Sequence, residues 1–136
     1  MTIRWDESLR FGEPAIDKQH EEIFVHFNKL TCAIENGDGN AVIIDLLTCL
    51  NDYASIHFAY EEKMMEYHKY SGLEEQRKQH SIFKENITII ADMQKINPSS
   101  YESPMRLLSE LIRYCILHVQ KLDKEFACYI KAESIK

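Results

Sequence analysis

Turn-forming residues are scarce in this chain of 136 residues, which contains 4 glycines and 3 prolines. A β-sandwich or barrel needs a turn about every 8 to 12 residues, so this scarcity excludes a many-stranded fold. Few breaks favour long elements, and long elements are typically helices. The length fits one domain, and the 45% of hydrophobic residues are enough to bury a core.

Excess positive charge and long apolar runs are also missing. The formal net charge is -6 and the pI about 5.5, so no basic field is available to bind nucleic acid. No run approaches the roughly 18 apolar residues of a membrane span, and the first residues are mixed in charge, unlike a secretory signal. We therefore expect a cytoplasmic protein with neither a nucleic-acid nor a membrane partner.

Cysteines are few, and no C-x-x-C spacing indicates a zinc or redox site. The chain has Cys32, Cys49, Cys115 and Cys128. Each lies within a helical pattern, so we expect reduced thiols in the core rather than disulfides.

Clusters of turn residues divide the chain into an arm and four long segments. The arm covers residues 1–15, where Trp5, Leu9 and Phe11 can pack against the rest. Each segment repeats apolar residues at a spacing of three and four, as an amphipathic helix does. The segments span about residues 16–36, 40–69, 73–96 and 104–131. Short connections between them predict a single all-α domain, an up-down-up-down antiparallel four-helix bundle with an N-terminal arm.

Each of the four apolar stripes is interrupted by a histidine. These residues are His20, His57, His80 and His118, and Glu61 follows His57 by one helical turn. A polar group on the core side costs a few kcal/mol unless it is paired, so four such positions need a shared explanation. The remaining histidines, His26 and His68, fall off the stripes, and we expect them at the surface.

The levels of these residues along an antiparallel bundle also match. Counted from the connecting turns, His20 faces His57, and Glu61 faces His80. By the same count His80 lies near the level of His118, and Asp123 lies level with Gln76. These seven positions fall within a slab about 10 Å thick, which is the thickness of a two-metal site.

The donor set points to a transition metal. Several imidazoles with a minority of carboxylates suit iron, zinc, copper or nickel better than magnesium or calcium, and two carboxylates can bridge a pair of ions. Asp123 is the difficult member, because five residues past His118 correspond to about 140° around an ideal helix. We expect local unwinding, or a side chain that reaches along the helix, to bring Asp123 to the cluster.

The ordered set of motifs resembles the hemerythrin-like domain family, and its bacterial branch most closely. The matching pieces are Ile16-Asp17-x-Gln19-His20, His57-Phe58-x-x-Glu61-Glu62, His80-x-x-Phe83 and His118-x-x-x-x-Asp123-Lys124, with Trp5 and Asn28. The resemblance implies a non-haem di-iron centre inside the bundle, with an oxo or hydroxo bridge. It also implies reversible dioxygen binding at the iron that has fewer protein ligands.

Roles for single residues follow from the same resemblance. His20 and His57 are implied to hold the oxygen-binding iron. His80 and His118 are implied to hold the other iron, and Glu61 and Asp123 to bridge the two. The lining of the oxygen pocket is assigned to Ile23, Phe27, Phe58 and Tyr114, the last at a position where the family tends to have tryptophan.

Gln76 is the main departure, since it lies four residues before His80, where the family normally supplies another histidine. A neutral amide oxygen is a weaker donor than imidazole, so the second iron would lack one ligand or hold water or an anion. Weak or single-metal binding and a purely structural polar cluster remain open. An extra open position would make oxygenation less persistent, which suits an oxygen or redox sensor, such as the input module of a protein with a C-terminal signalling output domain.

Two other functions remain. A di-iron ferroxidase or peroxide-consuming enzyme is disfavoured because such bundles place more carboxylates and fewer histidines at the metals. A metal-poor helical interaction module is the other. The sequence has no phosphate-binding glycine loop and no Ser-His-Asp order, so we expect no enzyme and assign no catalytic residue.

Overall fold

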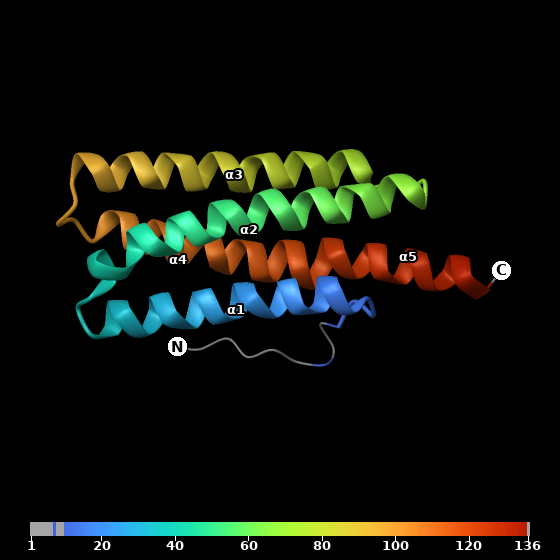
Figure 1. The fold of residues 1–136 in the computed structure, drawn as a ribbon, viewed down its shortest axis with the longest axis horizontal. Helices are drawn as coiled ribbons and strands as arrows, with labels where there is room; N and C mark the ends of the chain where they lie inside the picture. The colour runs from blue at the N-terminus through green and yellow to red at the C-terminus, as the bar shows by residue number, and fades with distance from the viewer. Residues whose placement is uncertain (1–6, 8–9, 136) are drawn as a thin grey trace.

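The computed structural model describes residue 7 and residues 10–135, and this part of the chain folds as four long antiparallel helical rods (Figure 1). The first three rods are α1 (Pro14–Glu35), α2 (Gly39–Tyr67) and α3 (Leu73–Ile96). The fourth rod is continuous and comprises α4 (Glu102–Arg113), the π-helical segment η2 (Tyr114–Asp123) and α5 (Lys124–Ile135). The prediction of an all-α, up-down-up-down four-helix bundle is confirmed.

Two of the rods begin earlier than the sequence pattern indicated. Helix α1 starts at Pro14 rather than near residue 16, and the Glu13 carboxylate accepts a hydrogen bond from the Ile16 backbone N–H at 3.0 Å. Helix α4 starts at Glu102, ahead of Pro104. Proline is tolerated in a first helical turn because its missing N–H has no intrahelical partner there, so neither proline delays its helix.

The C-terminal ends of two rods also differ from the predicted ends, one lying earlier and the other later. Helix α2 stops at Tyr67 rather than at residue 69, because Lys69 adopts a left-handed backbone with φ 53° that a helix cannot contain. The fourth rod continues to Ile135, past the expected end at residue 131.

The interior has an apolar half and a polar half. The apolar half lies towards the α1–α2 and α3–α4 connections and contains, among others, Leu30, Ile43, Leu46, Leu50, Ile90 and Leu107. The polar half lies nearer the α2–α3 turn, where every rod contributes a buried polar side chain. A polar cluster at this depth is held at one level by the packing of all four rods.

The described part of the arm is fixed to the bundle. The buried Asp17 carboxylate accepts hydrogen bonds from the backbone N–H groups of Phe11 at 2.6 Å and Gly12 at 3.1 Å. The Phe11 ring packs on Phe126 with the ring centroids 5.5 Å apart. Trp5 and Leu9, which were also expected to pack against the bundle, lie outside the described residues.

The thiols differ from their expected location. Only Cys115 is buried, whereas Cys32, Cys49 and Cys128 are exposed, so the expectation of core thiols is wrong for three of the four. Those three occupy outer faces of their helices, which the apolar pattern did not distinguish from the core face. None of the helices in residues 10–135 combines the length and apolar character that crossing a lipid bilayer requires.

Candidate metal centre

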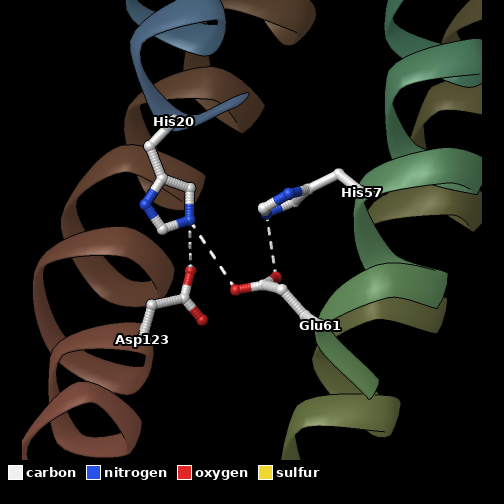
Figure 2. A group of neighbouring side chains, drawn as sticks. All are labelled: His20, His57, Glu61 and Asp123. Atoms are coloured by element: carbon white, nitrogen blue, oxygen red, sulfur yellow. Dashed lines mark ion pairs between the residues drawn. The ribbon is translucent and has the colours of Figure 1, made fainter. Parts of the chain in front are cut away.

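The structure brings six of the sequence-predicted site residues together in the polar half of the core. Four of them, His20, His57, Glu61 and Asp123, form one group whose potential ligand atoms all lie within 4.8 Å of one another (Figure 2). A second group contains His80 and His118 and shares Glu61 with the first. Every one of these six residues is at most 2% exposed.

Glu61 lies at the centre of the cluster, with imidazoles from three helices around its two oxygens. Its Oε1 is 2.8 Å from His57 Nε2 and 3.6 Å from His80 Nε2. Its Oε2 is 3.7 Å from His20 Nε2. One carboxylate therefore touches ligand candidates of both groups, which is the placement that a bridging carboxylate needs.

Asp123 makes the corresponding contacts on the other side. Its Oδ2 is 3.0 Å from His20 Nε2, and its Oδ1 is 3.2 Å from His118 Nε2. The Gln76 side-chain N–H donates to the same Oδ1 at 3.0 Å. Gln76 is itself buried, at 1% exposure, and thus belongs to the cluster as the level count indicated.

Segment η2 explains how Asp123 reaches the cluster. The π-helical backbone bonds residue i to residue i+5 and has more residues in each turn, so five residues overshoot one turn by much less than in an α-helix. His118 and Asp123 are separated by this interval and lie within η2, and both side chains consequently face inward. The local unwinding expected from the sequence takes the form of this ten-residue π-helical segment.

The atoms at the centre have the chemistry of a transition-metal site. His20 Nε2, His57 Nε2, both Glu61 oxygens, Asp123 Oδ2 and Gln76 Oε1 are buried and form no hydrogen bond of normal geometry with any described group. His80 Nε2 and His118 Nε2 also face each other at 3.1 Å. Buried donors and acceptors left in this state are costly, and cations placed among them would satisfy all of them at once. The residues present therefore fit a pair of transition-metal ions.

Two further side chains orient the imidazoles. Gln19 Oε1 lies 2.5 Å from His57 Nδ1, and Glu62 Oε2 lies 2.8 Å from His80 Nδ1. A proton on Nδ1 donated to these oxygens leaves the Nε2 lone pair directed at the cluster. Both residues belong to the matched motifs, but sequence reasoning gave them no role. The sequence feature that could have indicated this role is that Gln19 directly precedes His20 and Glu62 directly follows Glu61.

Aromatic rings form the wall of the cluster. Phe58 stacks on His80 with the centroids 3.8 Å apart and an interplanar angle of 4°. Tyr114 stacks on His118 at 4.8 Å, and Tyr53 on His57 at 5.0 Å. Ile23 and Phe27, the other expected lining residues, are fully buried on α1. Sequence reasoning missed Tyr53, although it lies one turn before His57 on the same stripe.

Charge pairing inside the cluster shifts several pKa values. Burial lowers the pKa of His20, but hydrogen bonding and charge from Asp123 and Glu61 outweigh it and raise the pKa to about 10. Burial acts to raise the pKa of Glu61, yet His57 and its neighbouring imidazoles hold it well below its ordinary value. Burial and the charge of Glu61 likewise raise the pKa of Asp123, but His118 and His20 bring it below its usual range.

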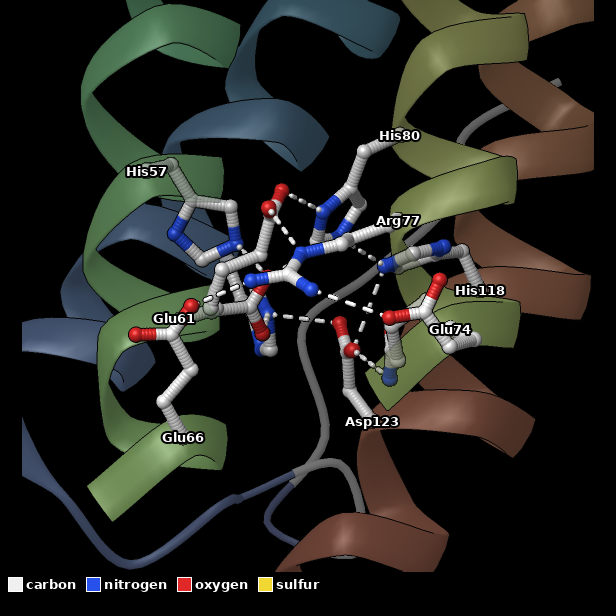
Figure 3. Close-up of polar contacts among 11 residues, drawn as sticks. His57, Glu61, Glu66, Glu74, Arg77, His80, His118 and Asp123 are labelled. Carbon is white, nitrogen blue, oxygen red and sulfur yellow. Dashed lines mark hydrogen bonds and ion pairs between the residues drawn. The ribbon is translucent and has the colours of Figure 1, made fainter. Parts of the chain in front are cut away.

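A surface network covers the cluster on the side of α2 and α3 (Figure 3). Arg77 pairs with Glu62 at 3.3 Å, with Glu74 at 2.9 Å and with Glu66. Glu62 thereby joins the buried His80 to an exposed ion-pair group. The two histidines outside the cluster are half-buried rather than fully exposed, and His68 Nδ1 lies 3.3 Å from Glu133.

Comparisons with known proteins agree with this geometry. The family model described as hemerythrin HHE cation binding domain matches residues 12–130. A bacteriohemerythrin of Stenotrophomonas maltophilia (strain R551-3) is 27% identical over 128 residues, covering 94% of this chain and 81% of that protein. A bacteriohemerythrin of Pseudomonas aeruginosa (strain LESB58) is 35% identical over 79 residues, which is 58% of this chain and 51% of that protein. A myohemerythrin of Riftia pachyptila is 39% identical over 79 residues, covering 58% and 60%.

Proposed function

The chain belongs to the hemerythrin HHE cation-binding domain family, and from that premise we propose that it binds dioxygen reversibly at two non-haem iron ions and reports dioxygen or redox state. The observation that carries the proposal is the group of buried imidazole and carboxylate ligand atoms that converge at one level of the bundle. The named relatives, bacteriohemerythrins and a myohemerythrin, support the oxygen-binding part of this proposal.

Each ion has its own pair of imidazoles in this proposal. His20 and His57 would hold one iron, and His80 and His118 would hold the other. Glu61 and Asp123 would serve both ions, in keeping with their contacts to histidines of both groups. A reduced iron pair bound there would supply the two electrons that reversible dioxygen binding requires.

The protein's own contribution is orientation and exclusion of water. Gln19 and Glu62 fix the tautomers of His57 and His80, as their Nδ1 contacts indicate. Ile23, Phe27 and Phe58 are at most 1% exposed, and the Phe58 ring packs on the rings of His57, His80 and His118, which keeps this side of the cluster dry. A dry pocket slows the loss of electrons to solvent, because charge separation is unfavourable in an apolar environment.

Gln76 favours a sensor over a carrier. Its amide nitrogen donates one hydrogen bond to Asp123, and its Oε1 is a weaker ligand for iron than an imidazole nitrogen. We assign the coordination position opposite Gln76 to an exchangeable water or anion. Such a position makes oxygenation shorter-lived and autoxidation easier, which suits the input module of a larger signalling protein.

Reversal of oxygenation tests the function directly. The chain is loaded with ferrous iron under argon, exposed to air and returned to argon while the iron charge-transfer absorption is followed. We expect the absorption to appear and then to decline with recovery of the ferrous state, in wild type and in a His26→Ala control but not in His57→Ala. Steady consumption of excess ferrous iron or peroxide, without recovery, would instead identify a ferroxidase or peroxide-consuming enzyme.

Replacing Gln76 tests the sensor assignment. Gln76→His supplies an imidazole at the open position, so we expect slower autoxidation and a more persistent oxygenated form. Gln79→His, on the half-buried face of the same helix, serves as the matched control and should leave both unchanged. Equal autoxidation rates for wild type and Gln76→His would show that Gln76 does not face an iron.

A further inference from the structure

A short segment ahead of α1 joins two rods at the end of the bundle nearest the cluster. This segment, residues 10–13, is called the strap below. Its backbone N–H groups at Phe11 and Gly12 donate to the buried Asp17 carboxylate, at 2.6 Å and 3.1 Å. The strap is therefore fixed to the first turn of α1, directly below the turn that presents the first histidine of the cluster.

The strap is also fixed to the fourth rod. The Lys124 ammonium donates to the Arg10 carbonyl oxygen at 3.2 Å. The Phe11 ring lies on the Phe126 ring, with the centroids 5.5 Å apart. Both partners belong to the first turn of α5, so the strap ties α1 to the fourth rod just beyond η2.

A layer of apolar side chains lies between this end of the bundle and the cluster. Its members are 0% exposed, and each is one helical turn from a cluster residue on the same rod, towards the end where α1 begins and α2 stops (Figure 1). The pairs are Ile16 and His20, Met65 and Glu61, and Phe126 and Asp123. A packed interior leaves no gap of ionic size, so an ion passes such a layer only when the layer moves.

Space around the strap allows it to move. A cavity of about 590 Å³ lies between the strap, Met64 of α2 and the α5 helix. A second cavity, of about 340 Å³, is lined by the strap and the first two turns of α1. The Arg10 side chain pairs with Glu7 and Asp17, but it is 58% exposed, so these ion pairs add little. A segment held in this way opens locally at a lower free energy than the whole bundle.

We propose that the strap is a gate that sets how fast metal ions enter and leave the cluster. In place, it holds the first turn of α1 and the Phe126 ring in the apolar layer. Released, it frees both, and the layer parts between α1 and the fourth rod. His20 and Asp123 face each other across that boundary at 3.0 Å. The gate rests on the metal centre of the proposed function, but not on reversible dioxygen binding.

Two glycines provide a matched pair of substitutions. Gly12 has φ 104° and Gly37 has φ 78°, a backbone region that L side chains rarely adopt. A Cβ would meet no atom within 4 Å at Gly12 and would make an ordinary contact at 3.9 Å at Gly37, so alanine adds backbone strain without a clash. Gly12→Ala strains the strap, whereas Gly37→Ala strains the α1–α2 connection at the opposite end and serves as the control. Phe11→Ala, which removes the contact with Phe126, tests the strap independently.

Metal exchange is measured in both directions under argon. Bound ferrous iron is withdrawn with a chelator in one experiment, and the metal-free chain is loaded with ferrous iron in the other. We expect Gly12→Ala and Phe11→Ala each to speed both release and uptake about ten-fold, with the iron content per chain unchanged. Gly37→Ala should keep the wild-type rates. In the metal-free chain, the backbone amide of residue 12 should lose protection against hydrogen exchange in both strap variants.

Each other result decides against the gate. Faster release without faster uptake would indicate a weakened site and would overturn the gate. Wild-type rates in both strap variants would overturn it as well and leave the metal centre in place. If Gly12→Ala does not fold, Phe11→Ala decides by the same two rates. A wild-type chain that takes up no iron would overturn the metal centre and the gate together.

Discussion

Helix α2 and segment η2 each present a histidine and a carboxylate to the cluster, but at different spacings. In α2 the carboxylate of Glu61 follows His57 by four residues, which a regular α-helix places on one face. In η2 the carboxylate of Asp123 follows His118 by five residues, and the π-helical backbone places it on one face. The type of helix therefore decides which carboxylate reaches the cluster.

Glu62 shows where a carboxylate at the five-residue spacing lies when the helix is a regular α-helix. It follows His57 by five residues, as Asp123 follows His118, but it lies in a regular helix. Its carboxylate contacts His80 Nδ1 and Arg77 at the edge of the cluster instead of entering it. A π-helix is rare and less well bonded than an α-helix, so its presence in η2 marks a stretch where the site outweighs local backbone stability.

The largest expected effect is the loss of either central carboxylate. We expect Glu61→Ala or Asp123→Ala to reduce anaerobically bound iron from about two ions per chain to one or none, because each carboxylate contacts histidines of both groups. Iron analysis measures the change, and far-ultraviolet circular dichroism verifies the helices. Glu66→Ala, which removes an exposed carboxylate from α2, is the control. Full iron content in one of the two central variants would show that α2 and η2 are not equivalent.

Moving the carboxylate in η2 by one residue sharpens the comparison. In the variant Leu122→Asp, Asp123→Leu the carboxylate follows His118 by four residues, as Glu61 follows His57. We expect no recovery of iron binding relative to Asp123→Ala, because Leu122 is only half-buried, whereas Asp123 is 1% exposed and contacts His20 and His118. Recovered iron binding would mean that η2 converts readily to a regular α-helix and that the π-helix is incidental.

Proton release on iron binding is the next largest effect. With its pKa raised to about 10, His20 carries a proton at neutral pH and must lose it before Nε2 can bind a metal. Apparent iron affinity should therefore rise with pH up to about 10, and each chain should release protons on loading. Calorimetry in buffers of different ionisation enthalpy measures this release.

Carboxylates from both helices contribute to the shift of the His20 pKa. Asp123→Asn and Glu61→Gln should each reduce the pH dependence of any residual iron binding, and Asp123→Asn the more, since Asp123 is closer to His20 at 3.0 Å than Glu61 at 3.7 Å. A pH-independent affinity in wild type would contradict the ion pairing in the cluster.

The smallest effect is expected for the carboxylate that the regular helix turns outward. Glu62→Gln keeps an acceptor oxygen for His80 but removes the charge opposite Arg77. Because the Glu62 and Arg77 side chains are 27% and 39% exposed, we expect the free energy of unfolding to change by less than about 1 kcal/mol. Iron stoichiometry should stay the same, with affinity falling at most about ten-fold. A loss as large as that of Glu61→Ala would place Glu62 among the ligands.

Much of this arrangement could be predicted from residue spacing. Apolar repeats gave four helices, and the histidines that interrupt them met at one level because packed antiparallel helices have a fixed rise per residue. The extent of η2 could not be predicted, since a stripe at spacings of three and four has the same appearance in a helix with a local π-helical turn. Tyr53 was missed for a related reason, because an aromatic residue on a core stripe is ordinarily an apolar packing residue.

One buried layer of the bundle is proposed to hold two iron ions in unequal surroundings. Mössbauer spectroscopy of the anaerobically reconstituted protein, combined with iron and protein quantification, tests it most directly. We predict about two ferrous ions per chain in two distinguishable environments, one beside His20 and His57 and the other beside His80, His118 and Gln76. A single ferrous environment at one ion per chain, or a chain that retains no iron, would contradict the account.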